Sequence, residues 1–69
     1  MEKEYTIKVA ESKEFWSELV KNRQGFVARL GDDRGVLEEL AYESLEDAND
    51  KFKQYMKLYD MREWNKAVS

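Results

Sequence analysis

The feature that most constrains this chain is an apolar stripe with helical spacing in residues 44–59. Five apolar side chains recur there at steps of three and four residues, which places them on one face of a helix. They are Leu45, Ala48, Phe52, Tyr55 and Tyr59. Ser44 can cap this helix, because its hydroxyl accepts a hydrogen bond from an amide of the first turn. Acidic residues then come before basic ones, as the helix dipole favours, so we predict a helix over residues 44–66.

An alternating segment near the N-terminus predicts a half-buried strand over residues 4–10. Tyr5, Ile7 and Val9 share one face of this strand, and polar side chains share the other. We expect the apolar face to be the one that contacts the core.

Residues 12–23 carry apolar side chains in two pairs with a spacing of four residues. They are Phe15, Trp16, Leu19 and Val20. Side chains at this spacing are neighbours on a helix surface, so the pairs predict a second helix with a narrow apolar stripe. Ser12 stands at its start as an N-cap. Gly25 follows its end, where a left-handed C-cap residue is expected.

A hairpin follows, with strands over residues 25–31 and 36–43 and an Asp-Asp-Arg-Gly turn between them. A simple two-residue loop would mix polar and apolar side chains on each face. A three-residue loop with Gly35 as a bulge separates them, because it places Arg29 opposite Glu39 on the polar face. The other pairs in this register are Asp32 with Val36, Ala28 with Leu40, and Phe26 with Tyr42.

A helical alternative competes with the second strand of this hairpin. Residues 36–66 contain no glycine and no proline, and their apolar side chains also fit helical spacing. One helix would then run through all of them. Ser44 would lie inside it, where its hydroxyl competes with the backbone, so we favour the hairpin.

These elements follow in the order β-α-β-β-α and predict a single α+β domain over residues 1–69. Two helices would cover one face of a three-stranded sheet, in a two-layer sandwich. A helix over residues 44–66 would be about 34 Å long. Strands of seven residues reach only about 23 Å. The sequence thus predicts a long C-terminal helix that overhangs the sheet.

The composition argues against most catalytic and metal chemistry. The chain has no histidine and no cysteine, so it lacks the usual general base, the thiol nucleophile and the ligands of most zinc sites. Its three glycines form no phosphate-binding loop. We therefore expect no enzymatic activity, no catalytic residue, no cofactor and no metal ion.

Charge and hydropathy bear on location and partners. The net charge of −3 argues against nucleic acid as a partner. No apolar run approaches the roughly 20 residues of a membrane span. The charged N-terminus is unlike a signal peptide. The absence of cysteine fits a reducing compartment, so we expect a cytoplasmic protein that does not bind membranes.

Two groups of residues are candidate partner surfaces. The first is an acidic patch in a segment without any basic residue: Glu38, Glu39, Glu43, Glu46, Asp47 and Asp50. The second lies on the overhanging helix: Tyr55, Leu58, Tyr59, Met61 and Trp64. Aromatic and methionine side chains are enriched in interface cores. For the acidic patch the alternative is a solvated strand edge and helix start, and for Trp64 it is burial against the domain's own core.

Together these features favour a small, acidic, non-enzymatic protein-binding module of the inhibitor or adaptor type, a class that includes phage-encoded proteins. Its partner would be another protein or a second copy of the chain. The alternative function is that of a DNA-binding accessory protein that uses the hairpin over residues 25–42. On that hypothesis the basic side chains near the hairpin would face DNA. They are Lys21, Arg23, Arg29 and Arg34.

Overall fold

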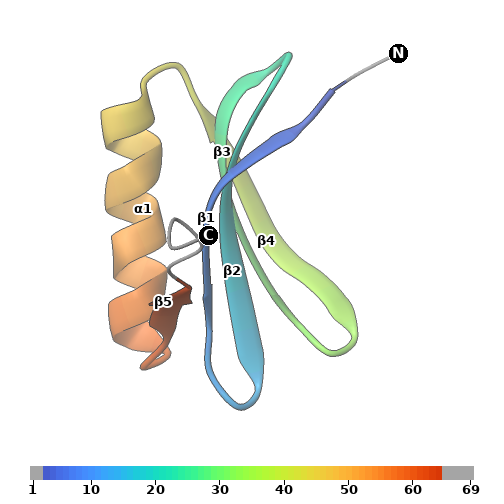
Figure 1. Cartoon of the computed structure of the whole chain (residues 1–69), viewed down its shortest axis with the longest axis vertical. Coiled ribbons are helices and arrows are strands. Elements are labelled where there is room, and N and C mark those ends of the chain that lie inside the picture. Colours follow the sequence, from blue (N-terminus) through green and yellow to red (C-terminus); the bar gives the residue numbers. More distant parts are fainter. Residues whose placement is uncertain (1–2, 65–69) are drawn as a thin grey trace.

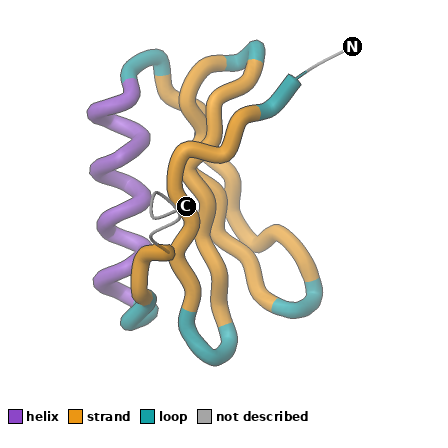
Figure 2. Tube along the Cα trace, in the orientation of Figure 1, coloured by secondary structure: helices purple, strands orange, loops and turns teal. Residues whose placement is uncertain are grey.

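The computed structural model describes residues 3–64, which form one antiparallel sheet and one helix (Figure 1). The elements are β1 (Tyr5–Glu11), β2 (Phe15–Asn22), β3 (Gly25–Asp32), β4 (Gly35–Tyr42), α1 (Leu45–Leu58) and β5 (Arg62–Trp64). The strand order across the sheet is β4-β3-β2-β1-β5, and all neighbours are antiparallel. The helix α1 lies against one face of this sheet (Figure 2). The opposite face, within this part of the chain, carries no helix.

The predicted three-stranded sheet with two helices is wrong, because residues 15–22 form a strand instead of a helix. Leu19 and Val20 are both fully buried although they point to opposite faces of β2, the central strand. A strand buried on both faces loses the alternation of apolar and polar residues, so its sequence also fits helical spacing. Ser12 caps the β1–β2 turn instead, where its hydroxyl accepts a hydrogen bond from the amide of Phe15 at 3.2 Å.

The predicted hairpin is confirmed, and this excludes the long-helix alternative. The pairs found as predicted are Arg29 with Glu39, Ala28 with Leu40, and Phe26 with Tyr42. The predicted three-residue loop with Gly35 as its bulge is wrong, because Asp32 pairs with Gly35 and leaves a loop of two residues, 33–34. The bulge lies at Leu37 instead, and it restores the predicted register farther along the strand. Gly35 still has the positive φ expected of it, 132°.

The helix α1 begins where predicted but ends at Leu58, well before the predicted end. Ser44 caps its start by accepting a hydrogen bond from an amide of the first turn at 3.1 Å. At the other end, Asp60 takes a left-handed conformation with a φ of 53°. The amide of Met61 then donates to the carbonyl of Met56 at 2.9 Å, as in a Schellman motif. The chain turns back here and forms β5 beside β1, so the predicted overhang is wrong.

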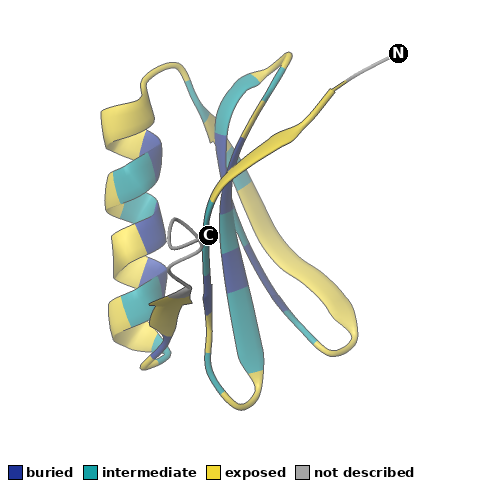
Figure 3. Cartoon of the chain, viewed as in Figure 1, coloured by how far each residue is buried: buried dark blue, intermediate teal, exposed yellow. Residues whose placement is uncertain are grey.

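The core lies between α1 and the sheet (Figure 3). Its buried side chains come from the helix, from the three central strands and from the segment after the helix. They are Ala10, Leu19, Ala28, Leu30, Ala48, Phe52, Tyr55 and Met61. Phe52 is fully buried, as expected for the middle of the helical stripe, whereas Leu45 at the start of α1 is 44% exposed.

The strand β1 differs from the prediction in the face that it turns to the core. Tyr5 and Ile7 are 61% and 41% exposed, whereas Ala10 is fully buried. The pairing of β1 with β2 is irregular between Thr6 and Lys8. Such an irregularity changes the phase of the alternation, so Tyr5 shares a face of the sheet with Ala10 and no longer with Val9.

Candidate functional site

The strand β4 forms one edge of the sheet, and within residues 3–64 no strand lies beyond it. Backbone amides and carbonyls of a strand point alternately to its two sides, so about half of those in β4 point away from β3. Val36 and Leu37 are 54% and 55% exposed, which is high for large apolar side chains. Figure 3 shows the exposed stretch of β4 in yellow. We call the side of residues 35–42 that faces away from β3 the β4 edge.

The predicted acidic patch begins on β4 and continues onto the start of α1. All six members are exposed: Glu38 and Glu39 in β4, Glu43 in the connection, and Glu46, Asp47 and Asp50 in α1. The negative charges on α1 are favourable at its N-terminus, because the helix dipole is positive there. The two glutamates of β4 have specific partners on opposite faces of the sheet.

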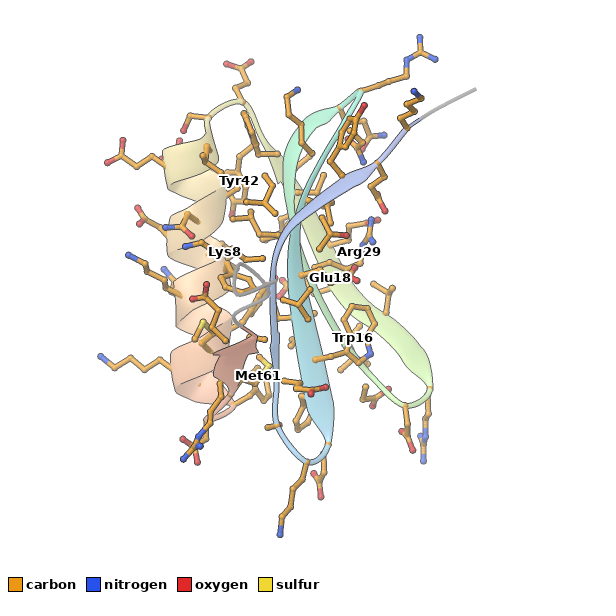
Figure 4. All side chains as sticks on the ribbon, in the orientation of Figure 1. Lys8, Trp16, Glu18, Arg29, Tyr42 and Met61 are labelled. Atoms are coloured by element: carbon orange, nitrogen blue, oxygen red, sulfur yellow. The ribbon has the colours of Figure 1, made fainter. Side chains whose placement is uncertain are left out.

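Arg29 lies near Glu18 on the face without the helix (Figure 4), and its guanidinium binds three carboxylates. Its guanidinium lies 2.8 Å from Glu4, 3.0 Å from Glu18 and 2.7 Å from Glu39. The Arg29 side chain is only 15% exposed, so solvent screens these ion pairs less than ordinary surface pairs. The hydrogen bond from Arg29 lowers the pKa of Glu4. The hydrogen bonds to Glu4 and then Glu39 raise the pKa of Arg29. This cluster ties the segment before β1 across the sheet to β3 and β4.

On the helix side, Glu38 accepts a hydrogen bond from the hydroxyl of Tyr55 at 2.8 Å. Tyr55 is 2% exposed, and the ammonium of Lys51 lies 5.3 Å from the centre of its ring. Burial raises the pKa of the Tyr55 hydroxyl, and the Glu38 carboxylate raises it further. The hydroxyl therefore stays protonated at neutral pH and connects α1 to β4.

The second predicted group does not gather on one surface. Tyr55 and Met61 are buried in the core, and Tyr59 is half-buried with its ring centre 4.5 Å from that of Phe15. Leu58 is 73% exposed. The backbone of Trp64 pairs with Val9, and its side chain lies outside the described part of the structure.

The four basic residues near the hairpin are also separated. Arg23 and Arg34 lie in turns at opposite ends of β3. The ammonium of Lys21 lies 5.1 Å from the ring centre of Phe26. Arg29 is held by its three carboxylates. The hairpin thus lacks a continuous basic surface in the region that the structure describes.

Sequence reasoning missed the role of Trp16 on the face without the helix. Its indole Nε1 donates to the carbonyl of Asp32 at 2.8 Å, and its ring lies directly over Gly31. Glycine is needed there, because a Cβ at this position would collide with the ring. Gly31 pairs with Val36, so the indole lies close to the start of the β4 edge. The signal in the sequence was a glycine within a predicted strand, which often marks a close approach by another group.

No group of three or more acidic side chains between residues 3 and 64 is arranged to hold a metal ion. In the same described region, the helix α1 is too short and too polar to cross a membrane. Comparisons with models of protein families, with curated protein sequences and with solved structures found no match. We therefore infer function from the surface of the molecule.

Proposed function

We propose that this chain is a small protein-binding module without catalytic activity, and that it holds its partner at the β4 edge. The observation that supports the proposal is an edge strand whose outer backbone groups have no strand partner among residues 3–64, with two exposed apolar side chains, Val36 and Leu37. Exposed strand edges and apolar patches are typical of protein interaction sites. The exposed acidic side chains beside the edge would add charge to the contact.

The proposed binding surface differs from the predicted group on the C-terminal helix. Tyr55 and Met61 are needed in the core, so a partner cannot contact them without opening the fold. Leu58 stays exposed and can contribute to an interface. The absence of histidine and cysteine supports a role by occupation of a partner, as an inhibitor or adaptor, rather than by chemistry.

Nucleic-acid binding has less support. Phosphate groups would have to displace carboxylates from Arg29, and Arg23 and Arg34 lie at opposite ends of β3. Proteins that bind DNA present basic residues on one face of the molecule.

Site-specific photo-crosslinking in the native host tests the proposal. The photoreactive amino acid p-benzoylphenylalanine is placed at position 37 on the β4 edge and, as a matched control, at position 53 on the outer face of α1, where Lys53 is exposed. We expect a discrete protein adduct from position 37 that excess unmodified chain removes, and none from position 53. Equal adducts from both positions, or adducts with nucleic acid, would contradict the proposal.

A further inference from the structure

We propose that the occupant of the β4 edge is an extended, lysine- or arginine-bearing segment of a partner protein, which adds to the sheet as a further strand beside β4. This inference rests on the proposed function, and it names the mode of binding and the chemistry of the partner. In strand addition the backbone hydrogen bonds supply affinity, and alternate side chains supply specificity.

The length and the geometry of β4 favour strand addition at this edge. The strand has eight residues, whereas β5 at the other edge has three within the described part of the chain. Natural edge strands are usually protected by charged side chains that project past the edge, above all by lysine. The β4 strand contains no lysine and no arginine.

The two charges of β4 are held back from the edge. Tyr55 binds the carboxylate of Glu38 at 2.8 Å over one face of the sheet. Arg29 binds the carboxylate of Glu39 at 2.7 Å over the other face. Both side chains are thereby drawn inward, toward α1 and β3, so neither blocks the approach of another strand. The bulge at Leu37 protects the edge locally, and it lies near one end of the strand.

Charge identifies the occupant. Residues 35–50 contain six acidic residues and no basic residue. Two copies of β4 paired along their length would bring Glu38 and Glu39 close to their own copies, and like charges on neighbouring strands are destabilising. A segment with positive side chains would be attracted instead. The cluster keeps an excess of negative charge, because Arg29 neutralises only one of the three carboxylates around it. Glu38 and Glu39 lie on opposite faces, so two adjacent basic residues in the segment would reach one carboxylate each.

Calorimetric titration with capped six-residue peptides tests the inference. The probe is acetyl-Thr-Val-Lys-Lys-Val-Thr-amide. The first control replaces both lysines by glutamate. The second keeps the lysines but carries N-methyl groups on alternate amides, so it cannot pair as a strand. We expect each control to bind at least about tenfold more weakly than the probe. Glu39→Gln, which leaves Arg29 two carboxylate partners, should weaken binding of the probe, whereas Glu14→Gln on the β1–β2 turn should not.

Three results would overturn the inference. If the N-methylated peptide binds as tightly as the probe, the acidic surface binds basic peptides without strand addition, and the proposed function itself would stand. If the probe does not bind while position 37 still crosslinks a protein, the β4 edge is a binding surface for a different occupant. If sedimentation shows that the chain dimerises and that p-benzoylphenylalanine at position 37 crosslinks its own copy, the occupant is a second copy.

Discussion

The hydroxyl of Tyr55, in the last part of α1, donates a hydrogen bond of 2.8 Å to the carboxylate of Glu38 on the edge strand β4. The donor is buried and the acceptor is exposed, so the bond reaches from the core to the rim of the sheet. It fixes the Glu38 side chain on the helix side, and it supports the edge strand from the side opposite to the cluster around Arg29.

Replacement of Tyr55 by phenylalanine removes this hydrogen bond and keeps the ring. We expect Tyr55→Phe to lower the free energy of unfolding by about 1–3 kcal/mol, as for a hydrogen bond to a charged group. Urea unfolding at neutral pH measures this loss. Tyr5→Phe is the matched control, because Tyr5 is 61% exposed. An equally small effect of both substitutions would mean that the bond contributes nothing.

The same tyrosine predicts a loss of stability at alkaline pH. Its pKa is raised in the folded chain above its ordinary value of 10.0, so the folded state holds the proton longer than the unfolded state. The stabilising contribution is therefore complete below about pH 10 and is lost as the pH rises further. Between about pH 9 and pH 12, the free energy of unfolding should fall more steeply with pH for the wild type than for Tyr55→Phe. Parallel curves would contradict the buried, protonated hydroxyl.

Glu4 predicts a corresponding loss at acid pH. The hydrogen bond from Arg29 lowers the pKa of Glu4 below its ordinary value of 4.5, so the ionised form is favoured in the folded chain. The stabilisation is present above about pH 4.5 and is lost as the pH falls below it. Acid unfolding of Glu4→Gln should therefore depend less on pH than that of the wild type or of Glu14→Gln, a control in the exposed β1–β2 turn. If the free energy of unfolding falls identically at acid pH in all three chains, the segment before β1 does not bind Arg29.

Gly31 predicts a packing clash that a second substitution relieves. A Cβ at this position would collide with the Trp16 ring and lie 2.6 Å from the carbonyl oxygen of Gly35. We expect Gly31→Ala to cost about 1–3 kcal/mol. In a Trp16→Leu background the same change should cost less by more than about 0.5 kcal/mol, the usual error of additivity. Chemical denaturation of the wild type, the two single variants and the double variant measures this coupling. Strictly additive free-energy changes would show that the Trp16 ring and position 31 do not interact.

Phe52 and Leu58 test which face of α1 supports the fold. Phe52 is fully buried, so Phe52→Ala should cost about 3–5 kcal/mol, which is much of the stability of a chain this short. Leu58 is 73% exposed, and Leu58→Ala should change stability by less than about 0.5 kcal/mol. Thermal unfolding distinguishes the two. A cooperative and nearly unchanged transition for Phe52→Ala would place the core on another face of the helix.

Local signals made part of this fold predictable from the sequence. The cap at Ser44, the positive φ of Gly35 and the pairing of Arg29 with Glu39 each depend on neighbouring residues. The strand β2 was mispredicted as a helix because other elements cover both of its faces. Such burial removes the alternation of apolar and polar residues that marks a strand. The end of α1 was missed because Asp60 takes the left-handed position that glycine usually takes, and aspartate does so only occasionally.

The candidate site was predictable only where it is continuous in the chain. The acidic residues of β4 and α1 follow one another in sequence, so their shared exposure could be expected. The binding of Glu4 to Arg29 could not, because it depends on where the segment before β1 lies. The binding of Glu18 could not either, because it requires β2 to be a strand paired with β3. The β4 edge is likewise a product of strand order. A strand shows its apolar pattern in the sequence, but its place in the sheet is set by the other strands.

Amide hydrogen exchange along β4 tests the central claim, that this edge is open and accepts a strand. Amides of β4 that point away from β3 should exchange rapidly in the chain alone, because no strand of the described region pairs with them. Saturation with the peptide acetyl-Thr-Val-Lys-Lys-Val-Thr-amide should slow their exchange, and should leave the amides of the central strand β2 unchanged. Slow exchange of every β4 amide in the chain alone, or unchanged exchange with the peptide bound, would contradict the account.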